Sequence, residues 1–217
     1  MTPVSVNNEA FTDVIPSGKD SYSLAYGRES RPISVRSSVI GNANAEWGLK
    51  HSLVFDAVYE DCTIQGGLER AFDQVRGGNV VFRRCKFVNL GSRPPVASCW
   101  DLGKECDIGI KAGIRDVLFD HCEMNDVLIG DYSIYDQVDR PKARRITWDG
   151  CTNPNGRPII VRGRYCEADT LVFTNTRRSL LVWPKWVTYL YFAFNRLFGD
   201  KRVISPDQFV ISDEERV

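Results

Sequence analysis

The stretch Gly77-Gly78-Asn79-Val80-Val81-Phe82-Arg83-Arg84-Cys85-Lys86-Phe87 contains the unit on which the fold prediction depends. Side chains of a β-strand alternate between its two faces, so Val80 and Phe82 share one face. Two polar residues then bend the chain, and Cys85 and Phe87 share the next apolar face. The pattern predicts two short strands that turn their apolar sides toward one core.

The same unit, an aromatic residue three places before a cysteine or threonine, occurs five times at spacings of 23 to 37 residues. A strand unit repeated at such spacings is typical of a solenoid, in which stacked repeats bury a continuous core. The copies are Tyr59-Glu60-Asp61-Cys62, Phe82-Arg83-Arg84-Cys85, Phe119-Asp120-His121-Cys122, Trp148-Asp149-Gly150-Cys151 and Phe173-Thr174-Asn175-Thr176.

The chain has seven cysteines, and four of them occupy the same place in the repeat. Free cysteine packs as a small hydrophobic residue, so we expect a ladder of reduced, buried thiols. Neighbouring rungs lie about 4.7–4.9 Å apart, which leaves disulfide bridges as an alternative. The chain has only two histidines and no C-x-x-C pair, so we expect no metal site.

Composition and short motifs narrow the function classes. The chain of 217 residues carries 28 basic and 28 acidic residues, which argues against a nucleic-acid partner. It contains no P-loop, no G-x-G-x-x-G and no G-x-S-x-G motif, so we expect no cofactor. The first residues have neither a basic nor an apolar region, so we expect no signal peptide and synthesis in the cytoplasm.

Three regions are predicted along the chain. Residues 1–50 are polar, are broken by proline and glycine, and are expected to form an N-terminal arm or cap. Residues 51–183 carry the repeats and form the solenoid. Residues 184–217 are expected to form an aromatic helix, which caps the solenoid, contacts a partner or touches a membrane surface, followed by an extended tail. Charged and polar residues interrupt the apolar run, so no transmembrane span is predicted.

An apolar row is predicted on the outside of the solenoid. The residue before each repeat aromatic should face outward, where solvent favours polar side chains, yet it is apolar in four of the five copies. A cover over this row would explain it, either the N-terminal arm, the C-terminal helix or another subunit; the β-sheet propensity of branched residues is the alternative. The predicted interface residues are Val58, Val81, Leu118 and Val172 in this row, and Trp183, Trp186, Tyr189 and Phe192 in the C-terminal region.

A basic stripe is predicted on the strands that precede the units. Arg76, Lys111 and Arg162 each follow an apolar strand, with Glu69 and Asp73 nearby. Stacked on successive rungs, these cations would bind carboxylate or phosphate groups, as in an acidic polysaccharide. The alternative is a solvated ladder of ion pairs. The pair Asp120-His121 lies in the polar bend and is expected to be a solvated corner.

The stretch from Gly77 to Asn89 resembles a rung of the right-handed parallel β-helix of the pectate-lyase-like superfamily, and similar stretches recur through roughly residues 52–183. The resemblance implies an all-β fold with a single-stranded right-handed parallel β-helix. This scaffold carries lyases, hydrolases, adhesins and phage virion proteins, so it implies no one function.

Two functions are therefore expected. The first is a non-enzymatic structural or binding protein, such as a phage capsid decoration or tail-associated protein, that binds further copies of itself or other virion proteins. The second is a polysaccharide lyase or glycoside hydrolase that uses the outer cations and acids. No residue is singled out as catalytic.

Overall fold

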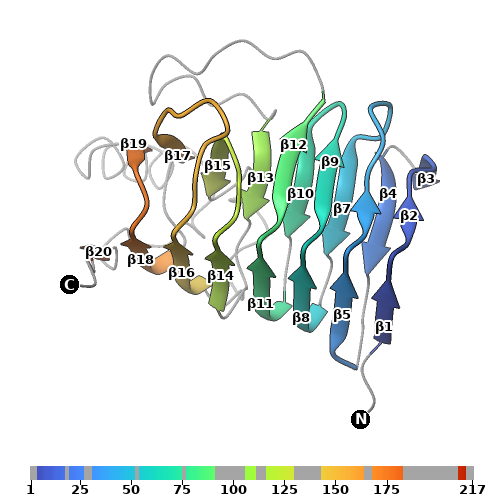
Figure 1. Cartoon of the computed structure of the whole chain (residues 1–217), viewed down its shortest axis with the longest axis horizontal. Coiled ribbons are helices and arrows are strands. Elements are labelled where there is room, and N and C mark those ends of the chain that lie inside the picture. Colours follow the sequence, from blue (N-terminus) through green and yellow to red (C-terminus); the bar gives the residue numbers. More distant parts are fainter. Residues whose placement is uncertain are drawn as a thin grey trace, which may run out of the picture.

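The computed structural model describes residues 4–17, 20–26, 31–51, 54–74, 77–90, 106–110, 116–129, 143–163, 168–182 and 210–213. These residues form three sheets that wrap around one core, with the strands of successive turns side by side along the long axis (Figure 1). Each turn passes through the three sheets in order, as in β8, β9 and β10. The predicted parallel β-solenoid is confirmed.

Sheet A has eight strands within the described residues. They are β1 (Val4–Asn7), β5 (Ile33–Arg36), β8 (Val54–Glu60), β11 (Gly77–Arg83), β14 (Asp116–Asp120), β16 (Ala143–Asp149), β18 (Ala168–Thr174) and β20 (Val210–Asp213). Sheet B contains β2 (Ala10–Phe11), β6 (Val39–Ile40), β9 (Thr63–Gly66) and β12 (Lys86–Asn89), and single bridges continue it through Glu123 to Thr152.

Sheet C also has eight described strands. They are β3 (Ile15–Ser17), β4 (Asp20–Tyr26), β7 (Trp47–His51), β10 (Arg70–Gln74), β13 (Cys106–Ile110), β15 (Asp126–Ile129), β17 (Ile159–Gly163) and β19 (Arg178–Val182). Every described pairing is parallel except that of β3 with β4, which is antiparallel.

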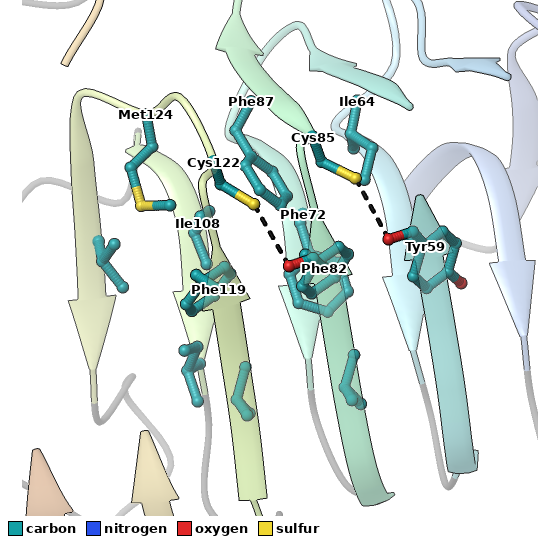
Figure 2. Packing of buried hydrophobic residues seen from close by; sticks show 14 of the residues in the cluster. Tyr59, Ile64, Phe72, Phe82, Cys85, Phe87, Ile108, Phe119, Cys122 and Met124 are labelled. Carbon is teal, nitrogen blue, oxygen red and sulfur yellow. Dashed lines mark hydrogen bonds between the residues drawn. The ribbon is translucent and has the colours of Figure 1, made fainter. Parts of the chain in front are cut away.

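The repeat aromatics form a continuous stack in the core. Phe82 lies between Tyr59 and Phe119, with ring centroids 5.0 and 5.4 Å away and nearly parallel planes. The stack continues through Trp148 to Phe173. All of these side chains are buried, as are the four repeat cysteines, which are reduced (Figure 2). The predicted inward orientation of the unit is confirmed.

The bend between sheets A and B is the most regular corner of the solenoid. One residue at this corner has a positive φ in each turn, from Asn8 (56°) and Ser37 (47°) to Asp61, Arg84, His121, Gly150 and Asn175. The N–H of this residue donates to a carbonyl of the next turn, as Asp61 does to Arg83 at 3.0 Å. The corner is therefore part of the hydrogen-bonded ladder.

The N-terminal region differs from the expected arm. Strands β1 to β7 lie in residues 4–51 and pair in register with the repeats, with Val35 opposite Tyr59 in sheet A. The same unit is present here, but Val35 stands at the aromatic position and Ser38 at the cysteine position. Because neither residue matches the aromatic-and-cysteine pattern, sequence reasoning did not extend the repeat into these turns.

The predicted C-terminal helix lies outside the described residues, and the described part of the chain contains no helix. Among the described residues, accordingly, there is no helix that could cross a membrane.

Candidate functional site

The predicted apolar row is assembled on the outward face of sheet A. Sheet register places Val58 opposite Val81, Val81 opposite Leu118, and Thr147 between Leu118 and Val172. Val58, Val81 and Leu118 are half-buried, whereas Val172 is only 4% exposed. The row therefore runs across five adjacent strands.

Polar rows flank the apolar row on both sides. On one side, the Asn79 amide donates a hydrogen bond to the Asp56 carboxylate at 3.1 Å. On the other side lie Arg36, Glu60 and the polar ends of the following strands. The outward face of sheet A thus has an apolar centre with charged and polar margins.

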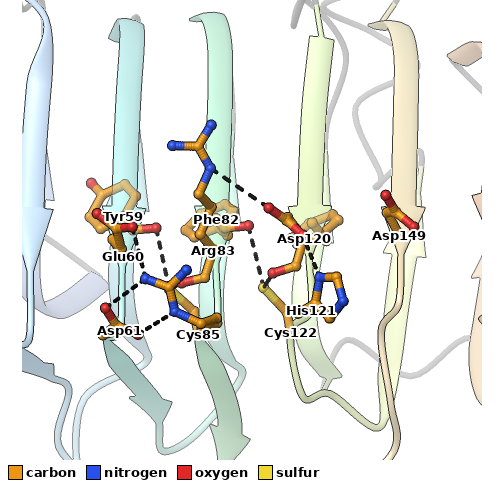
Figure 3. A network of polar contacts seen from close by, with 12 residues as sticks. Tyr59, Glu60, Asp61, Phe82, Arg83, Cys85, Asp120, His121, Cys122 and Asp149 are labelled. Carbon is orange, nitrogen blue, oxygen red and sulfur yellow. Dashed lines mark hydrogen bonds and ion pairs between the residues drawn. The ribbon is translucent and has the colours of Figure 1, made fainter.

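One of these margins, together with the corner beside it, forms a charged ladder (Figure 3). The Arg84 guanidinium contacts the Asp61 carboxylate at 2.7 Å and the Glu60 carboxylate at 2.8 Å, and Arg36 contacts Glu60 at 3.2 Å. The hydrogen bond from Arg84 holds the pKa of Asp61 below its usual value. Each of these ion pairs has at least one partner that is about half exposed or more, so each contributes little to stability.

His121 lies in this ladder as a corner residue. Its Nδ1 is 2.6 Å from an oxygen of Asp120, and its side chain is 67% exposed. Its ring lies against the next corner, because a Cβ built on Gly150 would be 2.8 Å from His121 Nε2. Within the described ranges no three His, Cys, Asp or Glu side chains are placed to hold a metal ion.

Of the predicted basic stripe, the structure describes the strand position of Arg162 alone. Arg162 lies opposite Leu128, Leu128 opposite Gly109, and Gly109 opposite Asp73. Arg162 therefore shares its level with Asp73, three residues before Arg76, and with Gly109, two residues before Lys111. The expectation that the three cations occupy equivalent places stays a prediction, because Arg76 and Lys111 lie outside the described residues.

Of the two acids predicted beside this stripe, Asp73 forms a buried ion pair with Arg70. Both side chains are fully buried. A Cβ at Gly109 would lie 2.6 Å from Arg70 Cδ, so glycine leaves room for this arginine on the neighbouring strand. Glu69 is half-buried, and its carbonyl accepts hydrogen bonds from Cys106 and Asn89.

Sequence reasoning missed Arg70 because β10 does not alternate regularly. Ala71 and Phe72 both belong to the core, so the residues on either side of them, Arg70 and Asp73, come to lie on the same side. In a regular strand, residues three apart lie on opposite faces.

Two further buried carboxylates serve as acceptors where sheet B meets sheet C. Asp107 accepts hydrogen bonds from the backbone N–H groups of Asn89 and Asn125, and Asp126 accepts one from the N–H of Asp107. These contacts connect successive turns. The predicted interface residues Trp183, Trp186, Tyr189 and Phe192 lie outside the described residues.

Fold and surface together define the class: an all-β parallel solenoid with an apolar row on one outward face. No protein-family model, no curated protein and no solved structure matched the chain.

Proposed function

We propose that this protein is a non-enzymatic structural or binding protein that assembles through the outward face of sheet A. The row from Val58 to Val172 carries the proposal. Its apolar side chains lie in register on four of five adjacent strands, with Thr147 on the fifth, and Val58, Val81 and Leu118 stand at half-buried outward positions where solvent favours polar residues. An apolar centre with polar margins is the usual anatomy of a protein interface.

The partner proposed for this face is a further copy of the chain or another protein of the same assembly. A component of a phage virion, such as a capsid decoration or tail-associated protein, is the particular form that we propose. The repetitive face supports this proposal. Its side chains are spaced as the strands are, so a second surface with the same spacing fits against them.

A carbohydrate-active enzyme is the other function that the sequence suggests. Such an enzyme would present an acid and a base to a sugar chain from the outside of the solenoid. Asp73, one of the acids predicted for that role, is buried and paired with Arg70. We therefore favour the binding function, and we expect the protein to release no ultraviolet-absorbing unsaturated product from acidic polysaccharides.

Sedimentation velocity of the full chain and of Val81→Glu/Leu118→Glu tests the outward face. We expect the wild-type chain to self-associate. The double variant should have a dissociation constant at least tenfold higher, which corresponds to a loss of about 1.4 kcal/mol of binding free energy. The control Val81→Thr/Leu118→Thr places β-branched, uncharged residues at both positions and should change association much less. Equal association of all three proteins, each shown to be folded by circular dichroism, would overturn the use of this face in self-association.

A further inference from the structure

The three sheets end differently at the N-terminal end of the solenoid. Sheet C ends with the antiparallel pair β3–β4. Sheets A and B end at β1 and β2, and within the described residues no strand pairs with the outer edge of either (Figure 1). Unpaired edges are the places where a β-protein can add a strand from another chain.

Hydrogen bonding determines which peptide groups of β1 face this free edge. The N–H of Asn8 donates to the carbonyl of Arg36 in β5 at 3.1 Å. The carbonyl of Asn7 belongs to the same peptide group and points the opposite way. Since bonding direction alternates along a strand, the N–H and C=O groups of Ser5 and Asn7 face outward from the sheet edge, and those of Val6 face β5.

The rows of the core also stop at this end. Val6, Phe11 and Leu24 are only partly buried, although their neighbours one turn inward, Val35, Ile40 and Leu49, are fully buried. Each of these residues is the first member of a row that continues through the solenoid, as the pairings of β1 with β5, β2 with β6 and β4 with β7 establish. A further turn would extend the rows and cover them.

We propose that this end binds the same end of a second copy, with β1 of one copy antiparallel to β1 of the other. The edge is self-complementary. Ser5 and Asn7 each offer one donor and one acceptor, and they lie on either side of Val6. When the strand is reversed by a two-fold axis through Val6, Ser5 faces Asn7 of the other copy and Asn7 faces its Ser5.

This register also suits the side chains. Val6 of the two copies form a non-hydrogen-bonded pair, in which Cα atoms of antiparallel strands approach to about 4.5 Å. The side chains of Ser5 and Asn7 are exposed on the outer face of sheet A, and neither is charged. The contact therefore buries no charged side chain of β1. The end-to-end contact is separate from the outward row of sheet A and does not depend on it.

The first test is Ser5→Pro, with Ser5→Ala as its control. Proline removes an N–H that faces only the free edge, and prolines are tolerated at such positions of edge strands. The two-fold contact loses one hydrogen bond from each copy. The dissociation constant of the dimer, measured by sedimentation velocity over a concentration series, should rise about 30-fold in Ser5→Pro. It should stay within about twofold of wild type in Ser5→Ala, which keeps the N–H.

The second test uses charges at exposed positions, which leave the core unchanged. Ser5→Lys/Asn7→Lys and Ser5→Glu/Asn7→Glu should each be monomeric, because like charges meet across the two-fold axis. An equimolar mixture should form heterodimers, because opposite charges then meet. The control Thr152→Lys/Asn155→Lys places the same charges at exposed residues of a later turn and should dimerise as the wild type does.

Three results would overturn the end-to-end contact. These are a wild-type chain that is monomeric at all concentrations, a dimer unaffected by Ser5→Pro, and two charged variants that do not associate when mixed. If the position-5 variants dimerise normally while Val81→Glu/Leu118→Glu does not, assembly uses the outward row of sheet A alone. The opposite pattern supports the end contact and contradicts self-association through that row.

Discussion

The thiol of Cys122 donates a hydrogen bond to the carbonyl oxygen of Phe82 on the preceding turn, with sulfur and oxygen 3.4 Å apart (Figure 2). Cys85 bonds the carbonyl of Tyr59, and Cys151 that of Phe119, in the same way. Each of these three cysteines thus contacts the backbone of the repeat aromatic of the previous turn, and Cys62 contacts the carbonyl of Val35 in the same place. Hydroxyl groups take the same place at the two ends of the ladder.

These hydroxyl groups explain which residue types the place accepts. Ser38 and Thr176 donate to the carbonyl two residues earlier, and every cysteine of the ladder also lies within hydrogen-bonding distance of that carbonyl, so its one thiol hydrogen is shared between two acceptors. The position needs a small side chain with one hydrogen to donate toward the corner. A ladder of Ser, Cys and Thr meets this need without any redox or metal chemistry.

Replacement of Cys85 tests this explanation. Cys85→Ala removes the donor and some volume from a fully buried site, and it should lower the free energy of unfolding by about 2 kcal/mol. Cys85→Ser keeps a donor and should be about 1 kcal/mol less destabilising than alanine. Urea unfolding followed by circular dichroism measures both values. A serine variant less stable than the alanine variant would contradict the donor role.

Thiol chemistry is expected to report unfolding rather than function. A hydrogen bond with Cys122, together with burial, raises the pKa of Cys85 to about 12, and the pKa values of Cys62 and Cys122 are also raised. Since the thiolate is the reactive form, these cysteines should resist iodoacetamide at pH 8 in the native protein and react in urea. Peptide mass spectrometry at each cysteine provides the measurement; rapid native labelling of Cys85 would refute the prediction.

The ion pair of Asp61 with Arg84 predicts a pH dependence of stability. The folded-state pKa of Asp61 lies below its ordinary value of 3.8. Its stabilising contribution is therefore present above that value and is lost as the pH falls through the lowered folded pKa. The stability difference between wild type and Asp61→Asn should shrink as the pH falls from 7 toward 2, measured by urea unfolding at each pH.

The test depends on how the stability difference between wild type and Asp61→Asn changes with pH. Asparagine also suits the positive φ of 54° at this corner, so the substitution itself adds no backbone strain. Arg84→Gln serves as the control. With the guanidinium removed, Asp61→Asn should show a much weaker pH dependence. An unchanged dependence in the Arg84→Gln background would mean that another partner lowers the pKa of Asp61.

Gly150 tests the backbone conformation of the corner. Its φ is 60°, a conformation that costs an alanine about 1 kcal/mol. Gly150→Ala should be destabilising by about that amount, and Gly150→Asn by less, because asparagine tolerates this region better. Thermal unfolding of both variants gives the order. Equal stability of the two variants would show that crowding against His121, rather than φ, decides the cost.

Gly109 tests the buried ion pair. A Cβ at this position would overlap the side chain of Arg70, which is fully buried and so has little room to move. Gly109→Ala should cost about 1–3 kcal/mol of unfolding free energy, as overpacked cores do. Gly156→Ala is a useful comparison, since no atom lies within 4 Å of its added Cβ and its positive φ of 67° alone should cost about 1 kcal/mol. A larger loss at Gly156 would contradict a steric origin.

Local patterns in the sequence were sufficient for the solenoid class and for the direction of the repeat side chains. Phe82 and Cys85 are buried as predicted, and Val81 faces outward, because strand alternation depends only on neighbouring residues. The corner after each aromatic was likewise expected from its polar residues. The stacking of the five units around one core could therefore be anticipated from the chain alone.

Only the tertiary structure determined which turns stack at which level. Arg162 is level with Asp73 because hydrogen bonds between strands far apart in sequence set the register, and no local pattern encodes it. The pairing of Arg70 with Asp73 depends on a local break in the alternation of side chains along β10, and the sequence pattern does not predict that break. The N-terminal turns were hidden because Val35 and Ser38 meet the same packing and hydrogen-bonding needs as an aromatic residue and a cysteine.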